Sequence, residues 1–366
     1  AARIDWNAVC PNDGETEIYL IGNPPYYGAK RQTVEQKADY PFVFGKRPYS
    51  KNMDYIALWF VKGADYITGS AAQLAFVTTN SVAQGEHVGL MFPMIFAKGL
   101  EIGFAYTSFK WENNAKRNAG VTVAVIGLRN RSSEPKYLYT DDLQIAATNI
   151  NGYLAEGADV VIERRSSPLG ALRPDMVFGS MPRDGGGLIL SPDERRRIVE
   201  ADARSDVFIK RYMGSSEFIN DGERYCLWVP DEQAVLARSI SVIGARLDRV
   251  SEERLKSKAG STAAYASQPH RFVQISYKPT DSIIVPRVSS ARREYIPIDY
   301  LGPDTVISDA AFGVYDAKPW LFALLTSQMH MSWARAVGGQ LKTDYRYSNT
   351  IVYNNFPVPP LSDEVK

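Results

Sequence analysis

Four consecutive residues, Asn23-Pro24-Pro25-Tyr26, place an amide, a rigid backbone and an aromatic ring next to one another. Two adjacent prolines have fixed φ angles and no N–H groups, so they form a stiff corner whose carbonyl groups point outward. The Asn23 side-chain oxygen and the Pro24 carbonyl can each accept one N–H from a planar amine, and Tyr26 can stack on the ring that carries the amine. These bonds draw the nitrogen toward sp³ geometry, and its lone pair can then attack an electrophilic methyl group. The pattern predicts a site that methylates an amine.

The alternative is that this corner is only a turn, because Asn and Pro are ordinary turn residues. The residues before it favour the chemical interpretation. An apolar, strand-like run from Ile18 to Ile21 stops at Gly22, directly before the corner. Ligands of open α/β sheets bind beyond the carboxyl ends of the strands, and the corner is expected at such an end.

The elements that follow alternate between helical spacing and short apolar runs, which predicts a doubly wound α/β layer. In chain order the expected elements are helix 54–67, strand 73–78, helix 88–98, strand 102–109 and strand 121–128. The polar stretch Arg129–Pro135 shows neither pattern. We therefore predict a first domain of residues 1–132 and a second domain of residues 133–366.

The second domain is expected to be α+β. Asp193–Ala203 has the pattern of a charged helix, with Ser191 as its N-cap and Pro192 at its first position. A second helical region is expected over residues 231–258. The expected strands are 225–229, 272–277, 282–288 and 306–308.

Composition describes an ordinary globular protein of 366 residues, which suggests two or three domains. Lys and Arg total 42 and Asp and Glu total 41, so a nucleic-acid surface would need its positive charge clustered in space. Two cysteines exclude a disulfide framework, and three scattered histidines give no metal-ligand spacing. This cysteine usage favours the cytoplasm. The most apolar stretch, residues 88–106, is broken by Pro93 and charged residues, so no membrane span is expected.

The Asn-Pro-Pro-Tyr motif resembles the catalytic loop of amino-methyltransferases that use S-adenosyl-L-methionine. The resemblance implies that the acceptor is adenine N6 in DNA, with the base flipped out of the duplex. It implies that Asn23 and Pro24 hold the amine and that Tyr26 stacks on the base. Residues 109–113 resemble a later motif of these enzymes, in which Trp111 would form the far wall of the base pocket. The alternative for Trp111 is core packing at the end of a strand.

Several further motifs resemble the MmeI-like (Type IIL) restriction–modification proteins. In that family one polypeptide joins a nuclease, an adenine-N6 DNA methyltransferase and a target recognition domain. The resemblance implies the C-terminal half of a Rossmann-like methyltransferase sheet, followed by a target recognition domain that reads double-stranded DNA over residues 136–366. The motifs that carry it are Gly179–Gly186, Gly214–Ile219 with Arg224–Trp228, Val288–Pro297, and Tyr345–Ser348 with Tyr353–Pro357.

The glycine-rich Phe-x-Gly-x-Gly loop with which such enzymes bind their cofactor does not occur in this sequence. Gly185–Gly187 lies in the recognition half, without the flanking strand and helix that such a loop needs. We therefore expect a piece of a longer enzyme, inactive alone, whose full-length form binds S-adenosyl-L-methionine while residues 1–366 bind it weakly or not at all. The strand Ile18–Ile21 should then be an exposed sheet edge, which favours self-association.

Seven residues are candidate DNA contacts. Arginine pairs bidentately with guanine, and mixed cationic and aromatic side chains suit phosphate surfaces. The candidates are Lys30 and Arg31 beside the catalytic loop, Arg292 and Arg293 between two strand-like runs, and Lys342, Tyr345 and Arg346 near the C-terminus. For Arg195–Arg197, which adjoin acidic residues on the same helix, a solvated helix face is the better interpretation.

Two other functions stay open. A protein glutamine methyltransferase also uses Asn-Pro-Pro-Tyr on an amide, but it would need no large second domain. A non-catalytic DNA-specificity module would keep the second domain, but it would need no intact loop at Asn23–Tyr26. Replacing Asn23 in the intact protein separates these functions. In a DNA methyltransferase, the variant should lose methylation and keep DNA binding.

Overall fold

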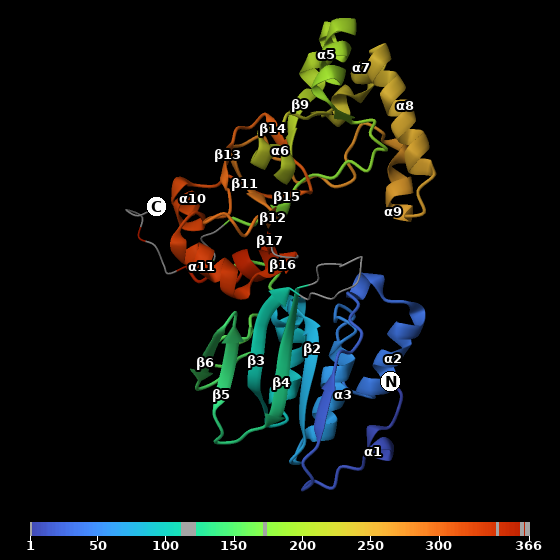
Figure 1. Cartoon of the computed structure of the whole chain (residues 1–366). Coiled ribbons are helices and arrows are strands. Elements are labelled where there is room, and N and C mark those ends of the chain that lie inside the picture. The colour runs from blue at the N-terminus through green and yellow to red at the C-terminus, as the bar shows by residue number, and fades with distance from the viewer. Residues whose placement is uncertain (1, 111–121, 171–173, 342–343, 359–361, 363–366) are drawn as a thin grey trace. The chain divides into compact units, whose positions relative to one another are not determined.

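The computed structural model describes residues 2–110, 122–170, 174–341, 344–358 and 362. They form two compact units (Figure 1). The first unit is Ala1–Arg165 with Arg335–Tyr345, and the second is Ser166–Ala334 with Arg346–Lys366. The sequence pattern predicted a boundary at residues 132/133. The first unit extends beyond it because two further strands continue the same sheet, and a segment near the C-terminus returns to it.

A six-stranded mixed sheet forms the centre of the first unit. Its order is β1 (Tyr19–Gly22), β2 (Gln73–Thr79), β4 (Thr122–Asn130), β3 (Leu100–Lys110), β5 (Lys136–Thr140) and β6 (Leu143–Ala147). β1 runs parallel to β2, with Gly22 opposite Phe76, so both strands end at the same edge. β4 is antiparallel to β2 and β3, and β5 is parallel to β3. The predicted strands are confirmed to within a few residues, and β1 lies at one end of the sheet.

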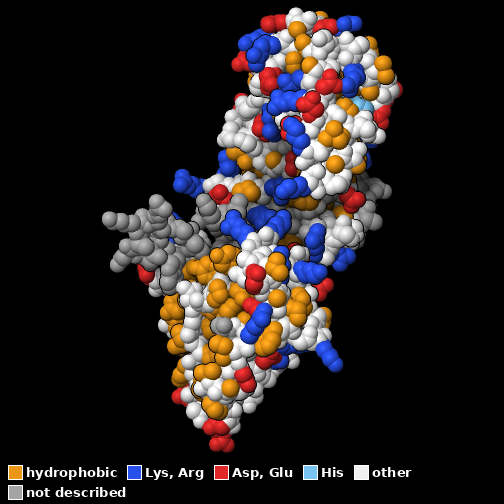
Figure 2. Space-filling model, turned by 90° about the vertical axis from the view of Figure 1, so that its right-hand side faces the viewer, with side chains coloured by type: hydrophobic (Ala, Val, Ile, Leu, Met, Phe, Trp, Pro, Cys, Tyr) orange, Lys and Arg blue, Asp and Glu red, His pale blue; other side chains and the backbone are white. Residues whose placement is uncertain are grey.

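The helices pack on one face of this sheet. α2 (Val34–Phe44), α3 (Ala57–Ile67) and α4 (Glu86–Phe96) share one apolar core with the sheet. Side chains alternate along β2, so that Leu74 and Phe76 enter this core while their neighbours face the other side. No described helix covers that other face, which carries the exposed side chains of Tyr19, Ile21 and Tyr106. Hydrophobic side chains are correspondingly visible on the lower left of Figure 2.

One helix was missed by the sequence analysis, which expected no helix or strand between the strand at residues 18–21 and the helix at residues 54–67. α2 lies inside that stretch, and it begins with a capping box between Thr33 and Gln36. Pro41 is an interior residue of this helix, and proline usually argues against a helix. Buried Tyr40 and Phe44 tie α2 to the core, so tertiary packing stabilises a segment of poor helical pattern.

The second unit has two four-stranded sheets. One has the order β14 (Thr305–Ile307), β9 (Ile209–Met213), β10 (Tyr225–Leu227), β8 (Ile189–Leu190), and the other β13 (Asp299–Leu301), β11 (Ser282–Pro286), β15 (Ala311–Tyr315), β7 (Val177–Phe178). α5 (Pro192–Ala201) begins with Ser191 as its N-cap and Pro192 at its first position, as predicted. The expected strand 272–277 is wrong, since only an isolated bridge from Gln274 to Met181 forms there.

The remaining α-helices and strands include α8 (Ser241–Leu255), which packs on the core of the second unit. They are α1 (Trp6–Val9), α6 (Ser215–Asn220), α7 (Ala234–Ser239), α8 (Ser241–Leu255), α9 (Gly260–Ala263), α10 (Pro319–Leu325), α11 (Gln328–Val337), β12 (Val288–Ser289), β16 (Gly339–Leu341) and β17 (Asp344–Arg346). Among the residues with described positions, no helix is long and apolar enough to cross a membrane.

Candidate active site and DNA contacts

The Asn-Pro-Pro-Tyr corner follows β1 at the carboxyl edge that β1 shares with β2, as the sequence predicted. Asn23 and Pro25 are exposed, and Pro24 is buried. Tyr26 is half-buried and packs against the core of the first unit. The corner therefore has one face fixed in the protein and a polar amide in solvent.

Two buried polar side chains hold the segment after the corner, and the sequence analysis missed both. Asp54, which is 5% exposed, accepts the backbone N–H of Tyr27 at 3.0 Å and that of Ile56 at 3.2 Å through the same oxygen. Gln32, also buried, donates from Nε2 to the Tyr27 carbonyl at 3.0 Å and to the Met53 carbonyl at 3.0 Å. The backbone at Tyr27 is thus fixed on both sides. An acidic residue just before the apolar pattern of α3 was the available signal for Asp54.

The loop after β2 lies at the same edge of the sheet. Asn80 begins it and is 9% exposed, and Asn52 donates to Glu86 at 3.3 Å near the start of α4. Burial lowers the pKa of His87, while the nearby carboxylates of Asp54 and Glu86 partly oppose that effect. His87 therefore favours its neutral form beside the residue that fixes Tyr27.

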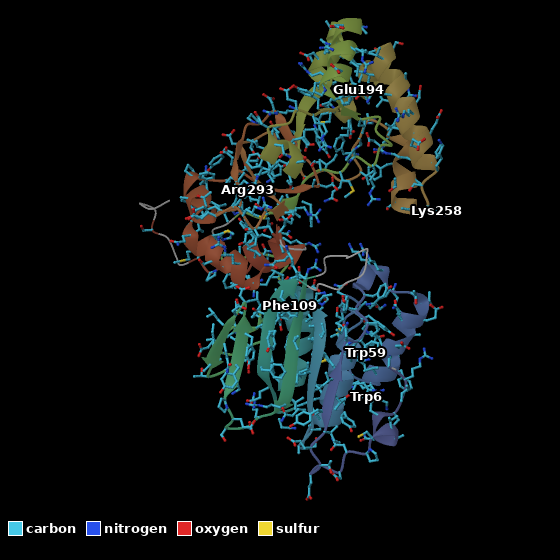
Figure 3. All side chains as sticks on the ribbon, viewed as in Figure 1. Trp6, Trp59, Phe109, Glu194, Lys258 and Arg293 are labelled. Carbon is cyan, nitrogen blue, oxygen red and sulfur yellow. The ribbon has the colours of Figure 1, made fainter. Side chains whose placement is uncertain are left out.

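Two predicted site residues fall outside the described part of the chain. These are Trp111, the candidate far wall of the base pocket, and Lys342, a candidate DNA contact. Figure 3 labels Phe109, which is 38% exposed near the end of β3, two residues before Trp111 in sequence. The role of Trp111 therefore remains a prediction.

The predicted DNA contacts that can be described are mainly exposed. Lys30 and Arg31 form a 3₁₀ turn shortly after Tyr26, so they belong to the same loop as the corner. Arg292 and Arg293 are exposed in the turn between β12 and β13 (Figure 3). Within the described ranges, none of these four cations forms an ion pair with a carboxylate. By contrast, Arg195 and Arg196 of α5 pair with Asp206 and Asp193, which supports the solvated-face interpretation.

One further cation was not singled out from the sequence. Arg287 lies over the rings of Phe178 and Phe312, with centroid distances of 4.9 and 5.9 Å, and donates to the Asp309 carbonyl at 3.0 Å. Burial lowers the pKa of Arg287, and the neighbouring positive charge of the predicted contact Arg346 lowers it further. The nearby Asp309 carboxylate partly opposes both effects. Arg287 could not be singled out from the sequence, because the two rings that it contacts belong to β7 and β15, which are remote from it in sequence.

The glycine run of the second unit is a packing feature. A Cβ on Gly187 would lie 2.3 Å from Val250 of α8, and one on Gly185 would lie 2.6 Å from Glu253. Arg246 and Arg254 of the same helix donate to backbone carbonyls of this loop. The loop is closed against a helix, so it does not fit the carboxylate or the ribose of S-adenosyl-L-methionine. The run Gly185–Gly187 is therefore not a cofactor loop.

The comparisons with known proteins agree with this arrangement. Residues 1–140 match the DNA-methyltransferase domain of MmeI, and residues 156–360 match the MmeI target recognition domain. The sequence is 42% identical to DNA methyltransferase A of Bacillus subtilis (strain 168), over all of this chain and 42% of that protein. The Type IIL restriction-modification enzyme MmeI, solved in complex with DNA, is similar with a TM-score of 0.90 and 37% identity, over 99% of this chain and 49% of that chain.

The fold and site thus define a DNA-methyltransferase domain joined to a target recognition domain. The chain belongs to the MmeI family, as its sequence motifs implied. It spans less than half the length of these two relatives. Methyltransferases in general use S-adenosyl-L-methionine.

Proposed function

We propose that this chain supplies the base-holding half of an adenine-N6 DNA methyltransferase together with the part that recognises its target sequence. The observation that carries the proposal is the Asn23–Tyr26 corner at the carboxyl edge of β1, fixed from behind by Asp54 and Gln32. The relative solved with DNA supports the choice of substrate class.

Each residue of the corner has a separate task. The Asn23 amide oxygen and the Pro24 carbonyl accept the two N–H groups of the flipped adenine, so its nitrogen presents a lone pair. Tyr26 stacks on the base and offsets part of the few kcal/mol that flipping costs. Pro25 keeps the corner stiff, because it has a fixed φ angle. The extra proton leaves only after methyl transfer, so no base is needed beforehand.

The decisive experiment replaces Asn23 in the full-length polypeptide. Asn23→Ala should abolish methylation of a cognate duplex while its affinity for that duplex is retained. Asn7→Ala, another exposed asparagine of the first unit, is the matched control and should leave methylation unchanged. A full-length parent protein that binds the duplex without methylating it would instead favour a non-catalytic specificity module, and methylation of a protein glutamine would favour the third interpretation.

The cationic residues make a separate, electrostatic prediction. If Arg292 and Arg346 each neutralise a phosphate, their replacement by Ala should weaken binding to all sequences and reduce the slope of log affinity against log salt by about one. Arg196→Ala is the control, because Arg196 is paired with Asp193. A slope equal to that of the parent protein would exclude the role.

The cofactor prediction concerns residues 1–366 alone. Because they lack the glycine loop, we expect titration calorimetry to give little or no heat with S-adenosyl-L-methionine. The full-length polypeptide should bind it. Tight binding by residues 1–366 would show that they hold a cofactor site of another kind.

A further inference from the structure

Tyr27, the residue directly after the Asn-Pro-Pro-Tyr corner, presents its aromatic ring to solvent. It is 48% exposed, whereas its neighbour Tyr26 is half-buried and packs against the core of the first unit. Among the residues that the structure describes, no other ring stacks on that of Tyr27, and no group forms a hydrogen bond with its hydroxyl. The ring is therefore available to a ligand.

Three hydrogen bonds fix the backbone from which this ring projects. The Tyr27 N–H donates to Asp54 Oδ1 at 3.0 Å, and the Tyr27 carbonyl accepts both the Tyr55 N–H and Gln32 Nε2 at 3.0 Å. Asp54, Tyr55 and Gln32 are all buried. The backbone is thus ordered on folding, and binding has to fix only the two side-chain torsions of Tyr27. A ring held in this way costs little to place on a ligand.

The turn that follows carries two exposed cations. The Arg31 N–H donates to the Gly28 carbonyl at 2.8 Å, which closes the 3₁₀ turn Ala29–Arg31. Lys30 and Arg31 form no ion pair with a carboxylate of the described ranges. A Cβ on Gly28 would meet no described atom within 4 Å, so the surface between the ring and the cations is open. We call residues Tyr27–Arg31 the cationic turn.

The cationic turn has the chemistry of a contact with one nucleic-acid strand. Bases stack on exposed aromatic rings, and lysine and arginine bind phosphates. Consecutive Cα atoms are about 3.8 Å apart, so Tyr27 lies one residue from Tyr26, the ring assigned to the flipped adenine. A base that leaves the duplex also leaves its neighbour in the strand without a stacking partner. The turn therefore offers a ring where an unstacked base is expected.

We propose that the cationic turn holds the DNA strand beside the flipped adenine. Tyr27 stacks on the neighbouring base of that strand, in the place that the adenine has left, while Lys30 and Arg31 bind phosphates of the same strand. The proposal rests on the proposed function and adds the residues that stabilise the flipped state. Tyr27 thus acts on base flipping, whereas Asn23 acts on methyl transfer.

The test uses the full-length polypeptide and two cognate duplexes, one fully paired and one with a mismatched base opposite the target adenine. On the paired duplex at saturation, Tyr27→Ala should lower the rate of methyl transfer about 10-fold, as expected for the loss of one base–aromatic stack. A mismatch reduces the cost of flipping, so on the mismatched duplex the loss should shrink to about 3-fold or less. Asn23→Ala should be inactive on both duplexes.

Two further variants separate stacking from a change in structure. Tyr27→Phe keeps the ring and should recover most of the rate that Tyr27→Ala loses. Tyr27→Leu keeps an apolar side chain without a π face and should resemble Tyr27→Ala. Tyr19→Ala is the matched control, because Tyr19 is 58% exposed on β1 of the same unit, and it should methylate at the parent rate.

The two cations are tested by the salt dependence of DNA binding. Lys30→Ala and Arg31→Ala should each reduce the slope of log affinity against log salt by about one. Lys98→Ala is the control and should leave the slope unchanged. Lys98 pairs with Asp65 at 2.8 Å and precedes β3, which runs in the same direction as β1, so it lies at the sheet edge opposite the corner. Parent-like slopes in both turn variants would exclude the phosphate contacts.

The outcomes distinguish this proposal from the proposed function. Parent-like methylation by Tyr27→Ala, with Asn23→Ala inactive, would overturn the stacking role alone. An equal loss on the paired and mismatched duplexes would also overturn it, because Tyr27 would then act after flipping. Full methylation by Asn23→Ala would overturn the proposed function and the role of Tyr27 together.

Discussion

The carboxylate of Asp54 is the sharpest place to perturb the catalytic corner. Its Oδ1 atom accepts two backbone N–H groups, at 3.0 and 3.2 Å, and one of them belongs to Tyr27, the residue after the Asn-Pro-Pro-Tyr motif. Asp54→Ala removes both acceptors. Asp54→Asn keeps one oxygen that can accept both N–H groups, but it removes the charge. The pair of variants separates the presence of the bonds from their charge assistance.

The expected magnitudes follow from the two bonds. Hydrogen bonds to a charged group contribute about 1.5–3 kcal/mol each, and neutral ones about 1 kcal/mol. In the variant, water can form some of the hydrogen bonds that Asp54 no longer accepts. We therefore take the lower end of the range for two bonds and expect Asp54→Ala to lower the free energy of local opening by about 3 kcal/mol. Asp54→Asn should lower it by about 1 kcal/mol. At 1.36 kcal/mol for each tenfold change in an equilibrium constant, the equilibrium constant for local opening should rise about 150-fold in Asp54→Ala and about 5-fold in Asp54→Asn.

Amide hydrogen exchange at Tyr27 measures this opening directly in residues 1–366. Asp13→Ala is the matched control, because Asp13 Oδ1 also accepts two backbone N–H groups, those of Glu15 and Thr16, in an exposed turn. It should leave exchange at Tyr27 unchanged. Equal exchange at Tyr27 in the parent and in Asp54→Ala would refute the idea that Asp54 fixes the corner. In the full-length polypeptide, kcat should fall in the same order, with Ala below Asn.

Three further outcomes follow from other residues. Burial keeps the pKa of His87 below 6.5 in the folded state, so the unfolded chain binds the proton more readily. The free energy of unfolding should therefore fall as the pH drops below 6.5. His87→Gln should flatten that dependence in urea titrations from pH 7.5 to 5. Arg254 is 1% exposed and donates to five backbone carbonyls. Arg254→Met should therefore destabilise the second unit by about 4 kcal/mol in thermal melts. A cost under about 1 kcal/mol would contradict the idea that these hydrogen bonds stabilise the unit. Ile21, 82% exposed on the edge strand β1, should promote self-association. In sedimentation velocity, Ile21→Lys should reduce self-association and the control Val9→Lys should not. A parent chain that stays monomeric at all concentrations would exclude the edge as an interface.

Four of the six strands and two central helices of the first unit could be predicted because local patterns determine them, whereas β5 and β6 were not expected. β2 alternates between core and open face, and α3 and α4 carry apolar residues at helical spacing. α2 could not be predicted in this way, since Pro41 and a run of aromatic residues hide its helical pattern. The strand expected over residues 272–277 failed for a related reason. Phe272 is buried by its contacts with Tyr212 and Trp228, which are remote in sequence, and not by pairing in a sheet.

The position of the corner at the end of β1 was predictable, because a motif and a strand adjoin in the sequence. Its supports were not. Asp54 and Gln32 act by accepting from or donating to backbone atoms of Tyr27, and polar residues of that kind are common in surface loops. Arg287 is similar, since the rings that stack on it come from β7 and β15. Residues that act through contacts remote in sequence carry no local signature.

The return of residues 335–345 to the first unit has a consequence for how such genes exchange parts. The chain leaves the first unit after Arg165, returns to it over Arg335–Tyr345 and then continues in the second unit, so a single genetic crossover between codons 166 and 334 would join the Asn80 and Gln84 of one parent to the Gln340 of another. Exchange of the whole second unit without any of the first therefore needs three crossovers, after Arg165, Ala334 and Tyr345. Chimaeras with one crossover between codons 166 and 334 would test whether Asn80 and Gln84 of one parent still bind Gln340 of the other.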